Sequence, residues 1–400
     1  MKGKFDFKKY SVVIIPAIVA VVVLSAFAIS GRVTKNTDAK APTAQTSVSA
    51  VNEEDSTVPE NVNSKVTILA VGDNLIHNTL IEAGELDDGT RDYTSLYANM
   101  KPEIEKADIA VINQETMLTN IEPYAGYPMF NTPYEVGEAA IDAGFDVFTC
   151  ASNHSMDMGF TGIQAEIDFF KEHKNVVQLG VNESADRAIK YYEKNGITFA
   201  MLNYTYGTNG IDLPADKPWC VDLMDKEVIT ADITQARQNA DVVIVFPHWG
   251  TEYSNGIDDY QRDYTQLFLD LGVDIVIGCH PHVIEPVEWV SDDETGRKML
   301  VYYSLGNFIS HQLEADRLIG GMAQITVEKN NGNISISTAK FIPVVTHYNR
   351  GSNGKFVFDV YKLGDWTDEL AASHSQDGCT VEHYKELAGE VIDEQFLSYS

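Results

Sequence analysis

Short, continuous apolar runs recur along the chain, and each of them ends in polar residues. Four runs begin with an aspartate, namely Asp108–Ile112, Asp146–Cys150, Asp241–Phe246 and Asp274–Gly278, and a fifth run covers Val66–Val71. Short runs of Val, Ile and Phe are typical of strands that are buried on both faces of a sheet. The pattern therefore predicts a sheet whose strand ends carry polar side chains.

Segments with helical periodicity alternate with these strands. The expected helices are Thr94–Lys106, Tyr134–Ala143, Phe160–His173, Lys226–Asn239 and Asp258–Leu271. The remaining expected strands are Val176–Val181, a hairpin over Tyr191–Asn203, and then Val283–Val290, Lys298–Ser304, Gly321–Glu328 and Asn333–Val345. Alternating strands and helices, followed by consecutive strands, predict a layered, mixed α/β fold with a hairpin-rich second half.

The first 64 residues differ in composition from the rest. Val12–Ile29 is an uncharged apolar run that follows four lysines, so it predicts a transmembrane anchor with a cytoplasmic basic flank over residues 1–30. A cleaved signal peptide is the alternative, since Ala26-Phe27-Ala28 resembles a cleavage site. Residues 31–64 predict a disordered linker. Both interpretations place a folded domain (65–348) and a partly helical C-terminal extension (349–400) outside the cytoplasm.

The charge of the chain limits the partners that it can have. Lys and Arg total 29 and Asp and Glu total 59, which gives a net charge of −30. This balance argues against nucleic acid, whose phosphates require basic residues. A polyanionic substrate would need a local positive site, which a divalent metal supplies. The four cysteines form no CxxC pair, so a thiolate zinc site is not expected, and a Cys220–Cys379 disulfide stays open.

Side chains with metal-binding chemistry follow the predicted strands. The metal-ligand candidates are Asp73, Glu115, Asn153, His248, His280 and His282. The strongest signal is His280-Pro281-His282, because residues two apart on an extended segment point to the same side. Each position alone is also explained as a helix cap or a polar loop residue. Together they form an oxygen and nitrogen ligand set, which suits one or two divalent Mn, Zn or Fe ions beyond the sheet edge.

The segment that follows Cys150 adds acid–base chemistry to this set. His154 can act as a general acid toward a leaving group. Asp157, three residues later, can hold the tautomer and orientation of that imidazole. The alternative is a polar cap for the helix that follows. His154 and Asp157 are therefore the candidate catalytic residues.

Six successive motifs resemble those of one bacterial family. They are Gly72-Asp73, Asn113-Gln114-Glu115, Asn153-His154 with Asp157 and Gly159, His248-Trp249-Gly250-Thr251-Glu252, Gly278-Cys279-His280-Pro281-His282 and Tyr303-Ser304-Leu305-Gly306-Asn307-Phe308. In this order they resemble the poly-γ-glutamate capsule-synthesis proteins, the CapA-like family, over roughly 67–308. That family is similar to calcineurin-like metallophosphatases, so the resemblance implies a metallophosphatase-like four-layer α/β/β/α sandwich.

The resemblance also implies a role for each matched residue. Asp73 and His282 would bind one metal, Glu115 would bridge, and the second metal would take Asn153, His248 and His280. The substrate site would involve Trp249, Glu252, Ser304 and Asn307. The chain departs from the phosphatases at Leu75, where they place a ligand histidine, and His77 lies nearby at a different spacing. The expectation is one secure metal and a second, weaker one.

The function expected from the resemblance is that of a membrane-anchored, extracytoplasmic protein of capsule and poly-γ-glutamate biosynthesis or export. A metal-dependent hydrolase site would act there, with membrane-embedded capsule-synthesis proteins as partners and polyanionic poly-γ-glutamate as the substrate. Two alternatives stay open. One is a general metal-dependent phosphoesterase or amidase of the cell envelope, and the other is a non-catalytic surface module that retains the fold.

Overall fold

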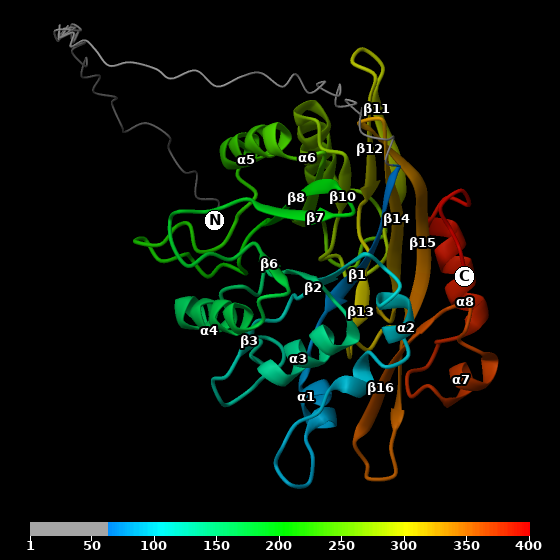
Figure 1. Cartoon of the computed structure of the whole chain (residues 1–400). Coiled ribbons are helices and arrows are strands. Elements are labelled where there is room, and N and C mark those ends of the chain that lie inside the picture. The colour runs from blue at the N-terminus through cyan, green and yellow to red at the C-terminus, as the bar shows by residue number, and fades with distance from the viewer. Residues whose placement is uncertain (1–62) are drawn as a thin grey trace, which may run out of the picture. The chain divides into compact units, whose positions relative to one another are not determined.

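Two sheets form the centre of the part of the chain that the computed structural model describes, residues 63–400 (Figure 1). The larger sheet has eight strands, and β13 (Asn307–Ile309) pairs with β1 beside its main path. The main path runs through β16 (Phe356–Lys362), β15 (Asn333–Arg350), β14 (Ile319–Asn330), β1 (Ser64–Asn74), β2 (Ile109–Asn113), β5 (Val147–Thr149) and β6 (Val177–Leu179). Strands β1, β2, β5 and β6 are parallel to one another, so their carboxyl ends meet at one edge.

The smaller sheet has six strands. Their order is β11 (Val287–Asp292), β12 (Arg297–Tyr302), β10 (Ile275–Ile277), β9 (Val242–His248), β8 (Ile197–Thr205) and β7 (Lys190–Lys194). The four inner strands run parallel, whereas β11 and β7 are antiparallel edges. A two-stranded sheet joins β3 (Leu118–Thr119) to β4 (Thr132–Pro133).

The alternation of side chains along β9 shows how the six-stranded sheet is covered. Ile244 and Phe246 belong to the large core that also contains β1 and β2. Val243 and Val245 point the other way, into a second core with α5 (Lys226–Asn239) and α6 (Asp259–Leu271). One face therefore meets the larger sheet, and the other face is covered by helices.

Helices also cover the larger sheet, on the side away from α5 and α6 (Figure 1). They include α3 (Tyr134–Ala143) and α4 (Gly159–Glu172), and Phe148 of β5 packs on Phe170 of α4 with ring centroids 5.1 Å apart. The other short helices are α1 (Asn78–Gly84), η1 (Thr94–Leu96), α2 (Lys101–Ile104), η2 (Ala315–Arg317), α7 (Asp368–Ser373) and α8 (Val381–Val391). The expected mixed α/β class is confirmed.

Each of the four aspartates that precede the predicted strands binds the backbone of the neighbouring strand. The pairs are Asp108 with Thr67, Asp146 with Ala110, Asp241 with Thr198 and Asp274 with Val243. In every pair the carboxylate accepts the neighbour's backbone N–H at 2.8–2.9 Å, and the aspartate's own N–H donates to the same residue's carbonyl at 2.8–3.0 Å. These two-point contacts fix the register of adjacent strands where they begin.

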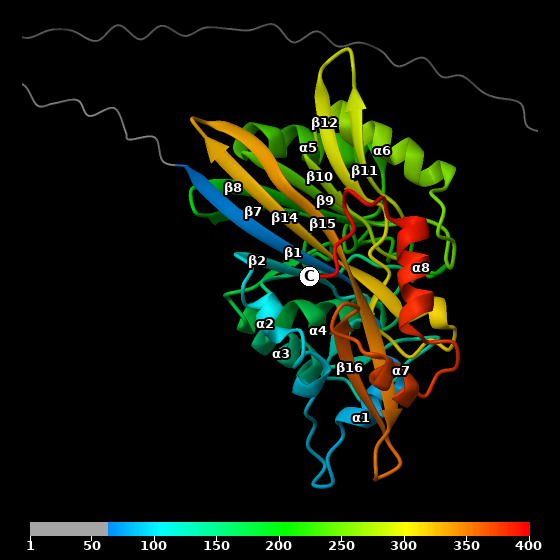
Figure 2. The same ribbon diagram turned by 90° about the vertical axis from the view of Figure 1, so that its right-hand side faces the viewer.

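The structure corrects one expectation about secondary structure. The helix expected over Thr94–Lys106 is instead η1 followed by α2, because Pro102 lies in the first turn of α2 and has no N–H with which to continue a helix from the residues before it. Within residues 349–400, β16 pairs along β15 of the larger sheet (Figure 2), and α7 and α8 follow it.

The expected anchor and linker lie in residues 1–62, outside the described residues. Between residues 63 and 400, no helix has the length and apolar character needed to cross a membrane. All four cysteines are buried and unpaired in the described part of the chain, so the open disulfide between Cys220 and Cys379 is not formed.

The aspartate contacts predict a measurable loss of stability. We expect Asp146→Ala to lower the free energy of unfolding by about 1–3 kcal/mol, because the N–H of Ala110 loses its side-chain acceptor. Asp146→Asn keeps an acceptor oxygen and should cost less. Urea unfolding of both variants measures the difference, with Asp293→Ala at an exposed position as the control. Equal midpoints for Asp146→Ala and the control would refute the role of the contact.

Candidate metal centre

The carboxyl ends of strands from both sheets bring the expected ligands together. Asp73 ends β1 beside Asn113 at the end of β2, and His248 ends β9 and pairs with Cys279 after β10. The five charged or imidazole ligands are at most 3% exposed: Asp73, Glu115, His248, His280 and His282. Strand ends that align at one edge thus concentrate these side chains in the interior.

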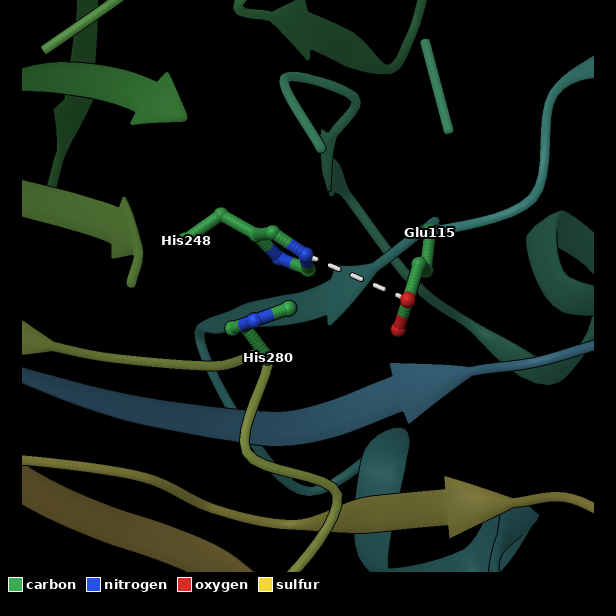
Figure 3. Close-up of side chains that lie close together, drawn as sticks. All are labelled: Glu115, His248 and His280. Carbon is green, nitrogen blue, oxygen red and sulfur yellow. Dashed lines mark ion pairs between the residues drawn. The ribbon is translucent and has the colours of Figure 1, made fainter. Parts of the chain in front are cut away.

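These five residues form two groups that share Glu115. One group is Glu115, His248 and His280 (Figure 3), and the other is Asp73, Glu115 and His282. In each group, one potential ligand atom per residue lies within 4.8 Å of the others. Glu115 Oε1 is 3.9 Å from His248 Nε2 and 3.7 Å from His282 Nε2. The division matches the two sets that the family resemblance implies.

The polar atoms of this centre lack the partners that buried groups normally have. Both oxygens of Glu115, Nδ1 of His248 and Nδ1 of His280 are buried, and within residues 63–400 none of them has a hydrogen-bond partner. Unpaired buried polar atoms are rare, and an unpaired buried carboxylate is especially unfavourable. A divalent ion held between Glu115 and the imidazoles would satisfy both carboxylate oxygens, so the residues fit a transition metal.

The pKa shifts of the ligands also favour a bound cation. Burial, then the carboxylates of Asp73 and Glu252, raises the pKa of Glu115 well above its usual value. Burial and the neighbouring histidines lower the pKa of His248, and the same causes lower that of His280 to about 3. Burial also acts to lower the pKa of His282, but the carboxylates of Glu115 and Asp73 outweigh it and raise this pKa to about 9. Carboxylates crowded in a dry site therefore favour a bound positive charge.

Two asparagines hold the ligands of the second group in place. The amide of Asn113 donates to Asp73 Oδ1 at 2.7 Å, and His282 Nδ1 lies 3.0 Å from Asp73 Oδ2. Asn307 Oδ1 lies 3.2 Å from the same His282 nitrogen, while its Nδ2 donates to the His282 carbonyl at 3.3 Å. Asn307 thus orients a ligand. Asn113 was not among the expected site residues, although it is the first residue of the Asn113-Gln114-Glu115 motif and lies two positions before a predicted ligand.

The backbone around the ligands is closely packed. A Cβ atom at Gly72 would lie 1.8 Å from the Gly306 carbonyl oxygen, so only glycine fits before Asp73. His280 and His282 have φ values of 107° and 60°, a left-handed region that non-glycine residues rarely occupy outside functional sites. Ser304, expected near the substrate, is fully buried and instead donates to the Val283 carbonyl at 2.8 Å. Its role here is to brace the loop.

His154 and Asp157 form the expected pair next to the ligands. His154 Nδ1 lies 2.8 Å from Asp157 Oδ2, which also accepts the backbone N–H of Phe130 at 2.6 Å. Asn153 Oδ1 lies 2.8 Å from His248 Nε2, so Asn153 contacts the first ligand group. The Asp157 carboxylate thereby keeps a proton on His154 Nδ1 and leaves Nε2 for other contacts.

A pocket of about 340 Å³ opens beside the centre. Among the expected site residues its lining includes Asn153, His154, Glu252 and His282. The other lining residues are Leu75, His77, Tyr127, Pro128, Met129, Phe130, Asn209, Ile211, Tyr253 and Gln312. Among these described residues there is no Lys or Arg. Sequence reasoning missed Phe130 and Asn209, which come from loops without a motif.

The structure places Trp249 away from the pocket. Its side chain is fully buried in the second core, stacked 6.1 Å from the ring of Tyr303, and its indole N–H donates to the Tyr303 carbonyl at 2.9 Å. Alternation along the strand explains this, because His248 faces the larger sheet and the next residue must face α6. The expected substrate contact of Trp249 is therefore wrong, and the residue supports the core.

The shared position of Glu115 gives a prediction about metal content. We expect about two ions per chain after equilibration with Mn²⁺. His280→Ala should remove about one ion, whereas Glu115→Ala should remove both, because Glu115 belongs to both groups. Elemental analysis after removal of free metal tests this, with His173→Ala at the end of α4 as the control. Equal losses in the His280 and Glu115 variants would contradict the sharing.

The chain matches known proteins over the segment that contains this centre. The family model described as bacterial capsule synthesis protein PGA_cap matches residues 67–312. The PGA biosynthesis protein CapA of Bacillus subtilis is 31% identical over 242 residues, which cover 59% of this chain and 62% of that protein. The capsule biosynthesis protein CapA of Bacillus anthracis is 33% identical over 184 residues, covering 44% of this chain and 43% of that protein.

Solved structures show weaker likeness. The NAD nucleotidase NadN of Haemophilus influenzae has a TM-score of 0.44 and 12% identity, covering 84% of this chain and 64% of that one. The calcineurin-like phosphoesterase YfkN of Bacillus subtilis has a TM-score of 0.37 and 14% identity, covering 82% of this chain and 98% of that one. The assignment therefore rests on the family match, which includes every ligand of both groups and covers more than half of the chain. The chain belongs to the bacterial capsule synthesis protein family PGA_cap.

Proposed function

We propose that this chain is a membrane-anchored, extracytoplasmic protein of poly-γ-glutamate capsule synthesis or export that carries a metal-dependent hydrolase site. We further propose that its two helix-covered sheets are a metallophosphatase-like four-layer sandwich. The observation that carries the hydrolase proposal is the pair of ligand groups sharing Glu115, with His154, held by Asp157, lining the adjoining pocket. The capsule role is supported by the family and by the names of its two relatives.

Different residues of the chain would bind the metal and donate the proton in hydrolysis. A divalent ion in such a site supplies Lewis acidity and lowers the pKa of water. Asp73, Glu115, Asn153, His248, His280 and His282 would hold the ions. His154 would give the proton on its Nε2 to the leaving group, while Asp157 keeps Nδ1 protonated and the ring in position. Burial of the ligands excludes bulk water from the reacting centre.

The charge of the pocket bears on the substrate. Glu252 lines it, and no lining residue in the described part of the chain is basic. The guanidinium of Arg317 comes near the rim, where it lies 3.6 Å from the centroid of the Tyr253 ring and pairs with Glu314 at 2.8 Å. A polyanion such as poly-γ-glutamate would therefore meet its positive charge at the bound ions.

The acid role of His154 predicts a loss of turnover without a loss of metal. We expect His154→Ala to lower kcat about 10²–10⁴-fold on bis(p-nitrophenyl) phosphate and on poly-γ-glutamate, because the leaving group loses its proton donor. Chromogenic release and chain-length analysis measure the two reactions, and elemental analysis checks the ions. His173→Ala is the control.

The outcomes of this assay separate the candidate functions. Turnover of the phosphodiester alone would favour a general phosphoesterase of the cell envelope over a capsule enzyme. A metal-loaded wild-type chain that hydrolyses neither substrate, nor an amide of the cell envelope, would favour a non-catalytic module. Unchanged kcat in His154→Ala would refute the acid role.

The proposed location rests on the sequence of residues 1–30. We expect the full chain to fractionate with membranes and its domain to be cleaved by protease added to spheroplasts, because the basic flank of the apolar run should stay in the cytoplasm. A chain lacking residues 1–30 should remain in the cytoplasmic fraction. Protection of the full chain from external protease would contradict the proposal.

A further inference from the structure

His77 lies in the pocket but is not part of either ligand group. It follows β1 by three residues, and it lines the pocket together with His154 and His282. The ring of Phe130 stands edge-on to both His77 and His154, with centroid distances of 5.6 Å and 4.7 Å. The two histidines thus flank one phenylalanine on the same wall. Neither group of potential metal ligands includes His77.

The backbone of a neighbouring strand fixes the tautomer of His77. Strand β13 runs parallel to β1, which brings His311 alongside His77. The His311 backbone N–H donates to His77 Nδ1 at 3.2 Å. Nδ1 also lies 3.2 Å from the Leu75 carbonyl oxygen, but that oxygen already accepts the His77 backbone N–H at 3.2 Å. The His311 N–H has no other acceptor within residues 63–400. A lone pair on Nδ1 satisfies both backbone groups, and it places the proton of the neutral ring on Nε2. Burial lowers the pKa of His77 to about 4, which keeps the ring neutral at physiological pH.

The proton on Nε2 has no acceptor in the protein. Within residues 63–400, no hydrogen bond involves His77 Nε2, which lies on the ring opposite the anchored nitrogen. The pocket that this ring lines has no basic residue in its described lining and includes the carboxylate of Glu252. The neutral Nε2–H of His77 can therefore bind an oxygen atom of a ligand, beside the side-chain amides of Asn209 and Gln312 in the same lining.

We propose that His77 is a substrate-binding residue whose Nε2–H, fixed by the His311 backbone, donates a hydrogen bond to an oxyanion oxygen of the ligand in the pocket. This inference rests on the proposed hydrolase-type site. It assigns His77 to the substrate rather than to a metal. The donor stands beside His154, so it would orient the group whose bond is broken.

Two amide variants separate the two ring nitrogens. In His77→Asn the side-chain oxygen can replace Nδ1 as the acceptor for His311, but the donor toward the pocket is lost. In His77→Gln the longer side chain can place an N–H where Nε2 was. The probe is inorganic phosphate, titrated calorimetrically into the Mn²⁺-loaded full chain, and His173→Gln is the control.

We expect His77→Asn to weaken phosphate binding about 10-fold or more, which is the usual effect of losing a hydrogen bond to a charged acceptor. His77→Gln should stay within about 3-fold of the wild type, and all variants should keep their metal content. Loss of one ion in either His77 variant would show that His77 is a ligand and overturn the proposal. Equal phosphate affinity of His77→Asn and the wild type, or no binding by the wild type, would also overturn it.

The same titration keeps this inference distinct from the hydrolase proposal. A chain that binds phosphate through His77 but turns over no substrate would retain the donor role and lose the catalytic one. Long-range ¹H–¹⁵N correlation of the histidine rings gives an independent check. We expect His77 to show an unprotonated Nδ1 and a protonated Nε2, and the reverse tautomer would refute the proposal.

Discussion

The register of the parallel strands is the constraint on which the rest of this structure depends. Each aspartate that begins a strand binds both the N–H and the carbonyl of one residue on the neighbouring strand. A slip by one residue would turn every side chain on that strand to the opposite face. His248 would then enter the helix-covered core and Trp249 would enter the centre. The geometry of the ligands at one end is thus set by polar contacts at the other.

Local pattern was sufficient for much of the fold and for the ligands. Helices α3 and α5 have the expected bounds because their apolar spacing and ends are clear in the sequence. The ligands were found because each lies at the end of a strand or in the loop that follows it. Asn113 and Asn209 were missed as site residues because their roles come from partners 40 or more positions away. Strand β16 was missed because its pairing with β15 is a tertiary contact that a weak local pattern does not show.

The centre and the surface of this protein are both negative, and the consequences differ. On the surface, a net charge of −30 over the chain favours solubility and repels other anions. In the interior, water cannot screen Asp73 and Glu115, so their charge must be balanced locally. His282 can provide one proton, and a divalent ion provides more. With ions bound at the centre, an anionic substrate would therefore be attracted most strongly to the pocket beside them.

Two histidines of the pocket wall, His154 and His77, are each held through Nδ1 but by different kinds of partner. His154 is held through Nδ1 by a carboxylate, and His77 is held through Nδ1 by a backbone N–H. The carboxylate keeps a proton on Nδ1 of His154, whereas the backbone N–H favours a lone pair on Nδ1 of His77, although the side chains are chemically identical. A bound molecule would therefore meet one imidazole anchored by a carboxylate and another anchored by a backbone N–H, and this difference would distinguish its two ends.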